Sequence, residues 1–80
     1  MIYISSDKRT NDFCNTLIRS KQWALTRRGK HSVLRHIAEC GYKTLVVSIT
    51  PSDSRAYSNL VREYKRYIRE YLIRRGAILA

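Results

Sequence analysis

The amino-acid sequence predicts an α+β domain in which a helix, three antiparallel strands and a second helix follow one another. Apolar residues recur at helical spacing near the N-terminus, change to strand-like patterns in the middle, and return to helical spacing after the single proline. Eighty residues suit one domain, which we assign to residues 1–80. We expect both helices to pack on one face of the sheet and to leave the other face open.

The first helix is expected from about Ser6 to Gln22. Phe13, Leu17 and Ile18 recur there at helical spacing, with polar residues between them. The start of this helix stays open because four nearby residues are suitable N-caps, namely Ser5, Ser6, Thr10 and Asn11. Ahead of it, residues 2–4 either form a short strand or cover the core.

The middle of the chain has the pattern of three short strands. Trp23 opens the first, an alternating stretch that Gly29 is expected to break by supplying the positive φ of a turn. The second strand is predicted over Ser32–Ala38, and residues 39–42 form the expected hairpin loop. The third strand is predicted over Lys43–Thr50, which is rich in β-branched residues.

The last helix is predicted over about residues 52–75. Pro51 ends the sheet, Ser52 or Asp53 is the expected cap, and Gly76 is the expected stop. Its apolar stripe includes four tyrosines, which we assign to the core: Tyr57, Tyr64, Tyr67 and Tyr71. About 23 residues span about 34 Å at 1.5 Å per residue, so the last turns should overhang a sheet of short strands.

The charge of the chain indicates a polyanionic partner. Sixteen Lys and Arg face six Asp and Glu, which gives +10, and eleven of the sixteen cations are arginine. Arginine matches phosphate in its fork geometry, so nucleic acid is the simplest partner, ahead of an anionic membrane or an acidic protein. The two cysteines are too few for a disulfide framework. We find no signal peptide and no spanning segment, so we expect a cytoplasmic protein with free thiols.

Two groups of basic residues are the candidate nucleic-acid contacts. The first lies at the predicted turn and comprises Arg27, Arg28 and Lys30. The second lies on the last helix and comprises Arg55, Arg62, Lys65, Arg66 and Arg69, with Arg74 and Arg75 beyond them. The alternative is a solvated face that Glu63–Arg66 and Glu70–Arg74 pairs neutralise. The start of this helix either binds a phosphate, with Arg55 adding charge, or is an ordinary cap.

His31 is the candidate catalytic residue because a histidine beside cations can act as an acid or base on RNA. Its neighbours Arg27, Arg28 and Lys30 would stabilise the phosphorane. A zinc site of His31, His36, Cys14 and Cys40 is not expected, because His31 and His36 are an odd number apart in a strand and point to opposite faces. We therefore expect no metal and no cofactor.

The run Trp23–His36, followed by Lys43–Pro51, resembles the HicA family of toxin–antitoxin ribonucleases. The resemblance implies a fold like the double-stranded RNA-binding domain, and it maps the family's catalytic histidine onto His31. Lys30 stands where that family prefers Ser or Thr, and the final helix is longer and more basic. The stretch Thr50–Ala56, with Asn59, is similar to small phage or prophage proteins without assigned activity.

We therefore expect a small nucleic-acid-binding protein that prefers RNA and contacts phosphates through a basic turn and a basic helix face. One alternative is an mRNA-cleaving toxin that uses His31 and pairs with an antitoxin. Another is a phage-encoded inhibitor that binds an acidic host protein in the host cytoplasm. No membrane role is expected, because the core needs the apolar stripe. The apolar tail Ala77–Ala80 suggests a homodimer contact.

Overall fold

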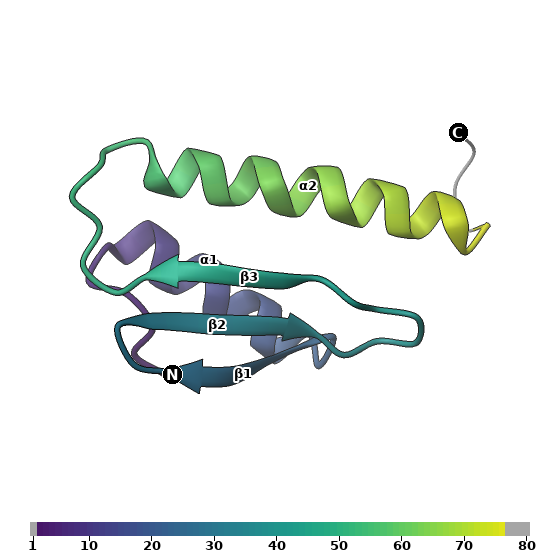
Figure 1. Cartoon of the computed structure of the whole chain (residues 1–80), viewed down its shortest axis with the longest axis horizontal. Coiled ribbons are helices and arrows are strands. Elements are labelled where there is room, and N and C mark those ends of the chain that lie inside the picture. The colour runs from purple at the N-terminus through teal and green to yellow at the C-terminus, as the bar shows by residue number, and fades with distance from the viewer. Residues whose placement is uncertain (1, 77–80) are drawn as a thin grey trace.

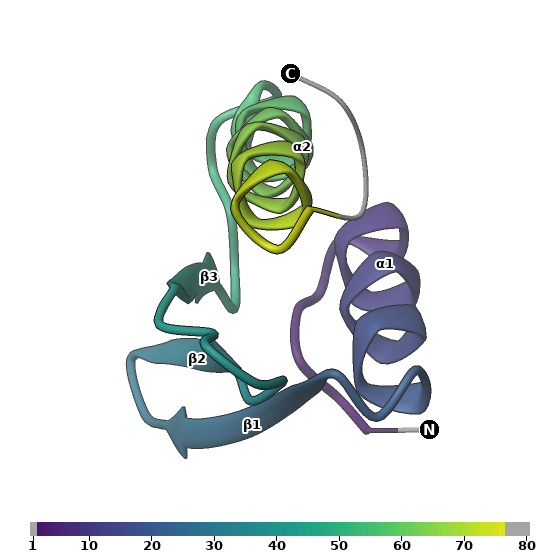
Figure 2. The same cartoon turned by 90° about the vertical axis from the view of Figure 1, so that its right-hand side faces the viewer.

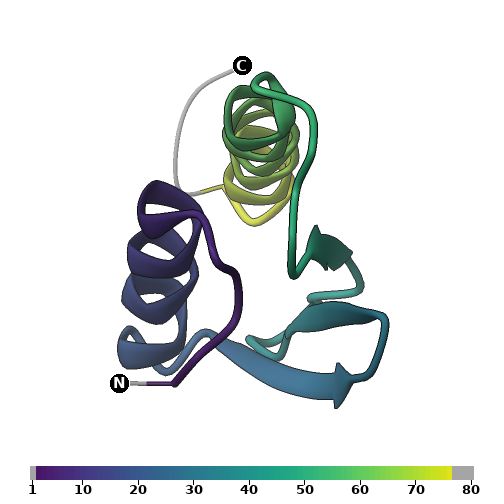
Figure 3. The same ribbon diagram turned by 90° about the vertical axis from the view of Figure 1, so that its left-hand side faces the viewer.

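The computed structural model describes residues 2–76, except for the side chain of Arg28; the tail proposed as a dimer contact lies outside these residues. Its elements are α1 (Lys8–Arg19), β1 (Trp23–Arg28), β2 (His31–His36), β3 (Thr44–Ser48) and α2 (Ala56–Arg74). The strands form one antiparallel sheet in the order β1-β2-β3 (Figure 1). Both helices lie on the same face of the sheet (Figure 2, Figure 3). The predicted αβββα order is confirmed, and neither helix is long and apolar enough to cross a membrane.

The first helix begins at Lys8, and its N-cap is Asp7. Asp7 was not among the four predicted caps. The Asp7 carboxylate accepts hydrogen bonds from the Thr10 amide at 3.0 Å and from the Thr10 hydroxyl at 2.7 Å. These bonds hold the pKa of the Asp7 carboxyl below its ordinary value. Asp7 satisfies a helix amide that has no partner within the helix, as an N-cap does.

Residues 2–5, which precede α1, do not form a strand; they pack over the core. The Asn11 side chain accepts a hydrogen bond from the Ile4 amide at 2.7 Å. The Asn15 side chain both accepts from the Ile2 amide and donates to the Ile2 carbonyl, at 2.9 and 2.8 Å. Two amide side chains of α1 thus replace strand partners, and Ile4 is completely buried.

The turn between β1 and β2 differs from the prediction for Gly29. Gly29 does not adopt a positive φ, and a Cβ atom at this position would meet no atom within 4 Å. The β1–β2 register instead shifts between Leu25 and Arg27, where a bulge adds local twist ahead of the turn. A glycine is therefore not required by the backbone of this hairpin.

The connection from β2 to β3 spans residues 37–43 and is longer than the predicted four-residue loop. Cys40 takes the positive φ, 63°, whereas Gly41 is needed for a different reason. A Cβ atom on Gly41 would lie 2.5 Å from the Nδ1 atom of His36 and 2.9 Å from the Ala38 carbonyl. The loop thus packs its backbone directly against a buried histidine.

The second helix starts later than predicted. Neither Ser52 nor Asp53 caps it: Asp53 accepts a hydrogen bond from the Arg55 amide at 2.8 Å and forms a separate turn ahead of the helix. Arg55 occupies the N-cap position without a side-chain cap, and α2 has 19 residues. Gly76, with φ 74°, ends the helix as expected.

The last turns of α2 extend past the ends of the strands, as expected, and there they contact the connection between β2 and β3 (Figure 1). The Tyr71 hydroxyl donates to the Glu39 carbonyl at 2.6 Å, and Arg75 donates to the same oxygen at 3.2 Å. The Arg74 guanidinium lies 4.9 Å from the centre of the Tyr42 ring. The long connection between β2 and β3 therefore extends the sheet layer to the end of the helix.

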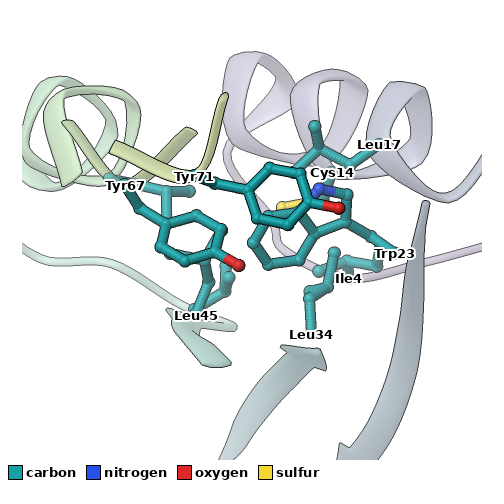
Figure 4. Close-up of a cluster of buried hydrophobic side chains, with 10 residues drawn as sticks. Ile4, Cys14, Leu17, Trp23, Leu34, Leu45, Tyr67 and Tyr71 are labelled. Atoms are coloured by element: carbon teal, nitrogen blue, oxygen red, sulfur yellow. The ribbon is translucent and has the colours of Figure 1, made fainter. Parts of the chain in front are cut away.

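The core lies between the two helices and the inner face of the sheet (Figure 4). It contains one residue of the N-terminal segment and residues of all five elements: Ile4, Cys14, Leu17, Trp23, Leu34, Leu45, Val47, Leu60, Tyr67 and Tyr71. Tyr64 packs against this cluster, and Tyr57 contacts Phe13 edge-on at 6.4 Å between ring centres. The assignment of the tyrosine stripe to the core is confirmed for Tyr64, Tyr67 and Tyr71, whereas Tyr57 is half-buried at the edge of the core.

Candidate nucleic-acid interface

Four predicted contact residues form a continuous exposed strip along α2, which we call the helix surface. It consists of Arg62, Lys65, Arg66 and Arg69. On the opposite side of the same helix, Leu60, Tyr67 and Tyr71 are buried in the core. Since residues three or four apart on a helix are neighbours, each of the four cations lies beside another.

A groove of about 710 Å³ runs along the helix surface. Tyr57, Val61 and Ile73 give it an apolar lining between the cations. The guanidinium of Arg9, on α1, lies 4.8 Å from the centre of the Tyr57 ring. The groove thus combines four cations with one acid, Glu70, and an apolar lining.

The acidic residues of α2 form no ion pair with the described cations of this surface, although Glu70 is part of the groove lining. Glu63 pairs instead with Lys43, whose Nζ atom lies 2.7 Å from the glutamate carboxylate. Between residues 2 and 76, no ion pair joins Glu63 to Arg66 or Glu70 to Arg74. The neutralising pairs of the alternative interpretation are therefore absent from the described structure.

Arg55 stands apart from the helix surface at the N-terminal end of α2. Its Nε atom lies 3.9 Å from the carboxylate of Asp53, and both side chains are exposed. This acidic neighbour partly offsets the charge that Arg55 would offer to a phosphate. The start of α2 is accordingly a weaker anion site than the strip that begins at Arg62.

The second group of predicted contacts lies at the β1–β2 hairpin. Arg27, Lys30 and His31 are exposed there and line a hollow of about 330 Å³ together with Val33 and Val46. Val33 and Val46 are direct cross-strand partners on the open face of the sheet. The hairpin therefore brings the candidate catalytic histidine and two of its three expected cations together. The side chain of Arg28 lies outside the described residues.

Arg35 belongs to the same exposed face, although the sequence-based analysis did not include it. In β2 the exposed residues His31 and Arg35 alternate with buried Ser32, Leu34 and His36. The period-two spacing from His31 was a signal that could have identified it. We call Arg27, Lys30, His31 and Arg35 the sheet surface.

The fold does not bring the helix surface and the sheet surface together. The sheet surface lies on the face that the helices leave open (Figure 2), and the helix surface lies on the side of α2 opposite its buried residues. The core separates them. The two predicted groups of basic residues therefore lie on different sides of the protein.

The two histidines lie on opposite faces of β2, as their spacing in the strand predicted. His31 is exposed and His36 is buried, on opposite faces of β2. His36 Nδ1 is hydrogen-bonded to the Tyr67 hydroxyl at 2.6 Å, and burial lowers its pKa. Burial raises the pKa of Cys14 to about 12, whereas Cys40 is exposed. In the described range, no three His, Cys, Asp or Glu side chains gather as a metal site would require.

Comparisons of the chain with protein-family models, with curated proteins and with solved structures gave no match.

Proposed function

We propose that this protein binds nucleic acid, with a preference for RNA, through the helix surface. The observation that carries the proposal is the absence of partners on this strip. In the described structure, Arg62, Lys65, Arg66 and Arg69 are exposed and have no ion pair or hydrogen bond within the chain. Three of the four are arginines, which bind phosphate oxygens in a bidentate manner.

The arrangement is unfavourable for the free protein, which supports a role in binding. Like charges three or four residues apart destabilise a helix by about 0.2–0.5 kcal/mol per pair. The strip contains four such pairs, against two pairs of opposite charge that Arg66 has with Glu63 and Glu70; the four are Arg62–Lys65, Arg62–Arg66, Lys65–Arg69 and Arg66–Arg69. A polyanion removes this repulsion and adds the entropy of released counterions.

The preference for RNA rests on the resemblance to HicA toxins and to double-stranded RNA-binding domains, together with the αβββα order. Double-stranded RNA is recognised mainly by shape, through phosphate and 2′-hydroxyl contacts. A strip of arginines without a reading element for bases suits recognition of that kind.

A salt-titrated panel of single- and double-stranded RNA and DNA tests this proposal. Each neutralised phosphate contributes about −0.9 to the log–log salt slope, so four contacts on a duplex give about −3.6. The variant Arg62→Gln/Lys65→Gln/Arg69→Gln is called the helix variant. It should bind more weakly, and the magnitude of its salt slope should be smaller by about 2.7. The control variant Lys8→Gln/Arg19→Gln/Lys21→Gln removes the same charge from α1 and the turn after it. Equal losses in both variants, or no binding to any of the four nucleic acids, would refute the proposal.

A second candidate function is RNA cleavage at His31, and the hollow at the hairpin favours it. His31 is exposed between Arg27 and Lys30, so the imidazole and two cations can approach the same phosphate. The imidazole would accept the 2′-hydroxyl proton while the 2′-oxygen attacks the adjacent phosphorus. The bond to the 5′-oxygen then breaks, a cyclic phosphate forms, and the 5′-oxygen takes up a proton.

Cleavage is measured in the same binding mixtures. His31→Ala should abolish cleavage and leave binding intact, because the helix surface is unchanged. Intact RNA after incubation with a stoichiometric amount of wild-type protein would refute this second function, and it would leave the binding proposal standing.

A further inference from the structure

We infer that the protein bridges two nucleic-acid duplexes, one on the helix surface and one on the sheet surface. This inference rests on the proposed function, because it requires the helix surface to bind. It adds a second binding site for nucleic acid. With both sites occupied, one protein molecule joins two duplexes.

The sheet surface offers positive charge without a compensating acid. The strand pairing places Ala24, Arg27, His31, Val33, Arg35, Thr44, Val46 and Ser48 on the open face of the sheet. None of these residues is acidic. In the described structure, the side chains of Arg27, Lys30 and Arg35 have no ion pair or hydrogen bond within the chain. Their charge is therefore available to phosphates, as it is on α2.

A single duplex cannot contact both surfaces. The residues of β2 that alternate with His31 and Arg35 are buried, and so are the residues of α2 opposite the helix surface. Each surface therefore points away from the core, the helix surface from the outer side of α2 and the sheet surface from the face of the sheet that the helices leave free (Figure 2). Nucleic-acid duplexes are stiff, since the persistence length of DNA is about 150 base pairs. Wrapping one duplex around a body 18–23 Å across its shorter axes would require a severe bend.

The same body separates two bound duplexes far enough to limit their repulsion. The Debye length is about 8 Å at physiological ionic strength. The protein is 18–23 Å across its shorter axes, which exceeds two Debye lengths. Each duplex is then attracted by the cations it touches and only weakly repelled by the other duplex.

The sheet surface favours a duplex over a single strand. Single strands bind proteins through bases stacked on aromatic rings. The open-face residues include two valines and an alanine but no Phe, Tyr or Trp. Phosphates are accessible on the outside of a duplex without unstacking any base, so they can be bound there by Arg27, Lys30 and Arg35.

The test uses a biotinylated RNA duplex of about 30 base pairs on beads and a fluorescent copy of the same duplex in solution. Wild-type protein should retain the fluorescent duplex on the beads with a bell-shaped dependence on protein concentration. Retention falls at excess protein because every duplex then carries its own molecules. A gel verifies that the RNA stays intact.

Two variants with matched loss of charge locate the sites. The sheet variant, Arg27→Gln/Lys30→Gln/Arg35→Gln, should still bind a duplex but lose retention to background, and the helix variant should lose it as well. The Lys8→Gln/Arg19→Gln/Lys21→Gln control should retain the fluorescent duplex. Circular dichroism of each variant confirms folding.

The possible failures are distinguishable. No binding of wild type to the bead-bound duplex refutes the proposed function itself. Binding without retention, or retention that persists in the sheet variant, overturns only the bridging inference. In the first of these two cases the sheet surface would be left to another partner, such as an acidic protein. In the second, bridging would come from paired helix surfaces in a dimer.

Discussion

Replacing Lys65 with glutamine should stabilise the free protein while it weakens RNA binding. Lys65 has Arg62 three residues before it and Arg69 four residues after it, and its other helical neighbours are Val61 and Ile68. It therefore experiences two repulsions and no attraction along the helix. Glutamine and lysine have nearly equal helix propensity, so the substitution changes mainly the charge.

Two relieved like-charge pairs correspond to about 0.4–1.0 kcal/mol at low ionic strength. For a domain of this size, 1 kcal/mol shifts the Tm by about 4–8 °C, so Lys65→Gln should raise the Tm by about 2–8 °C. Thermal unfolding followed by circular dichroism in about 10 mM salt measures the gain. In about 1 M salt the Debye length falls to about 3 Å, and the gain should largely disappear.

Arg66→Gln is the matched control on the same helix surface. Arg66 has two cations and two acids at helical spacing: Arg62, Arg69, Glu63 and Glu70. Its removal should leave the Tm nearly unchanged, although it weakens RNA binding as Lys65→Gln does. A Tm that falls or stays constant in Lys65→Gln at low salt would refute the reasoning. An equal rise in Arg66→Gln would show that net charge, and not the local pairs, sets the stability.

Gly41→Ala should destabilise the fold by about 1–3 kcal/mol in urea unfolding, because its Cβ would overlap His36 and backbone carbonyls. Gly29→Ala should be neutral or stabilising, since it has open space and no positive φ; equal effects of the two would contradict this assignment. His36 is buried with a lowered pKa, so its contribution to stability should be complete above pH 6.5, the ordinary value, and decline as the pH falls towards the folded-state pKa. Unfolding measured between pH 7.5 and 5 should show this slope, and His36→Gln should flatten it; an unchanged slope would exclude His36 as its source. A thiol reagent at pH 8 should label Cys40 in the folded protein and Cys14 only after unfolding, because burial raises the pKa of Cys14 to about 12. Rapid labelling of both would show that the core is open.

The order of the elements could be predicted from the sequence because their periodicities are local. The β-branched stretch from Leu45 and the tyrosine stripe of α2 each specify an element and its buried side without knowledge of the rest. The end of α2 at Gly76 also follows from a local backbone preference. The start of each helix was harder to predict, since several polar residues compete for the cap and a single side-chain bond, such as that of Asp7 to Thr10, decides among them.

The candidate site was predictable in its residues but not in its arrangement. The sequence by itself determined the excess of cations and the strip on α2, because helical spacing places those residues together. Tertiary structure decided that Glu63 pairs with Lys43 and leaves Arg66 unpaired, and that Arg35 joins His31 on the open face. It also decided that the two basic surfaces lie on different sides of the protein. The physical reason is that charge pairing and surface orientation depend on strand register and helix packing, which join residues far apart in the chain.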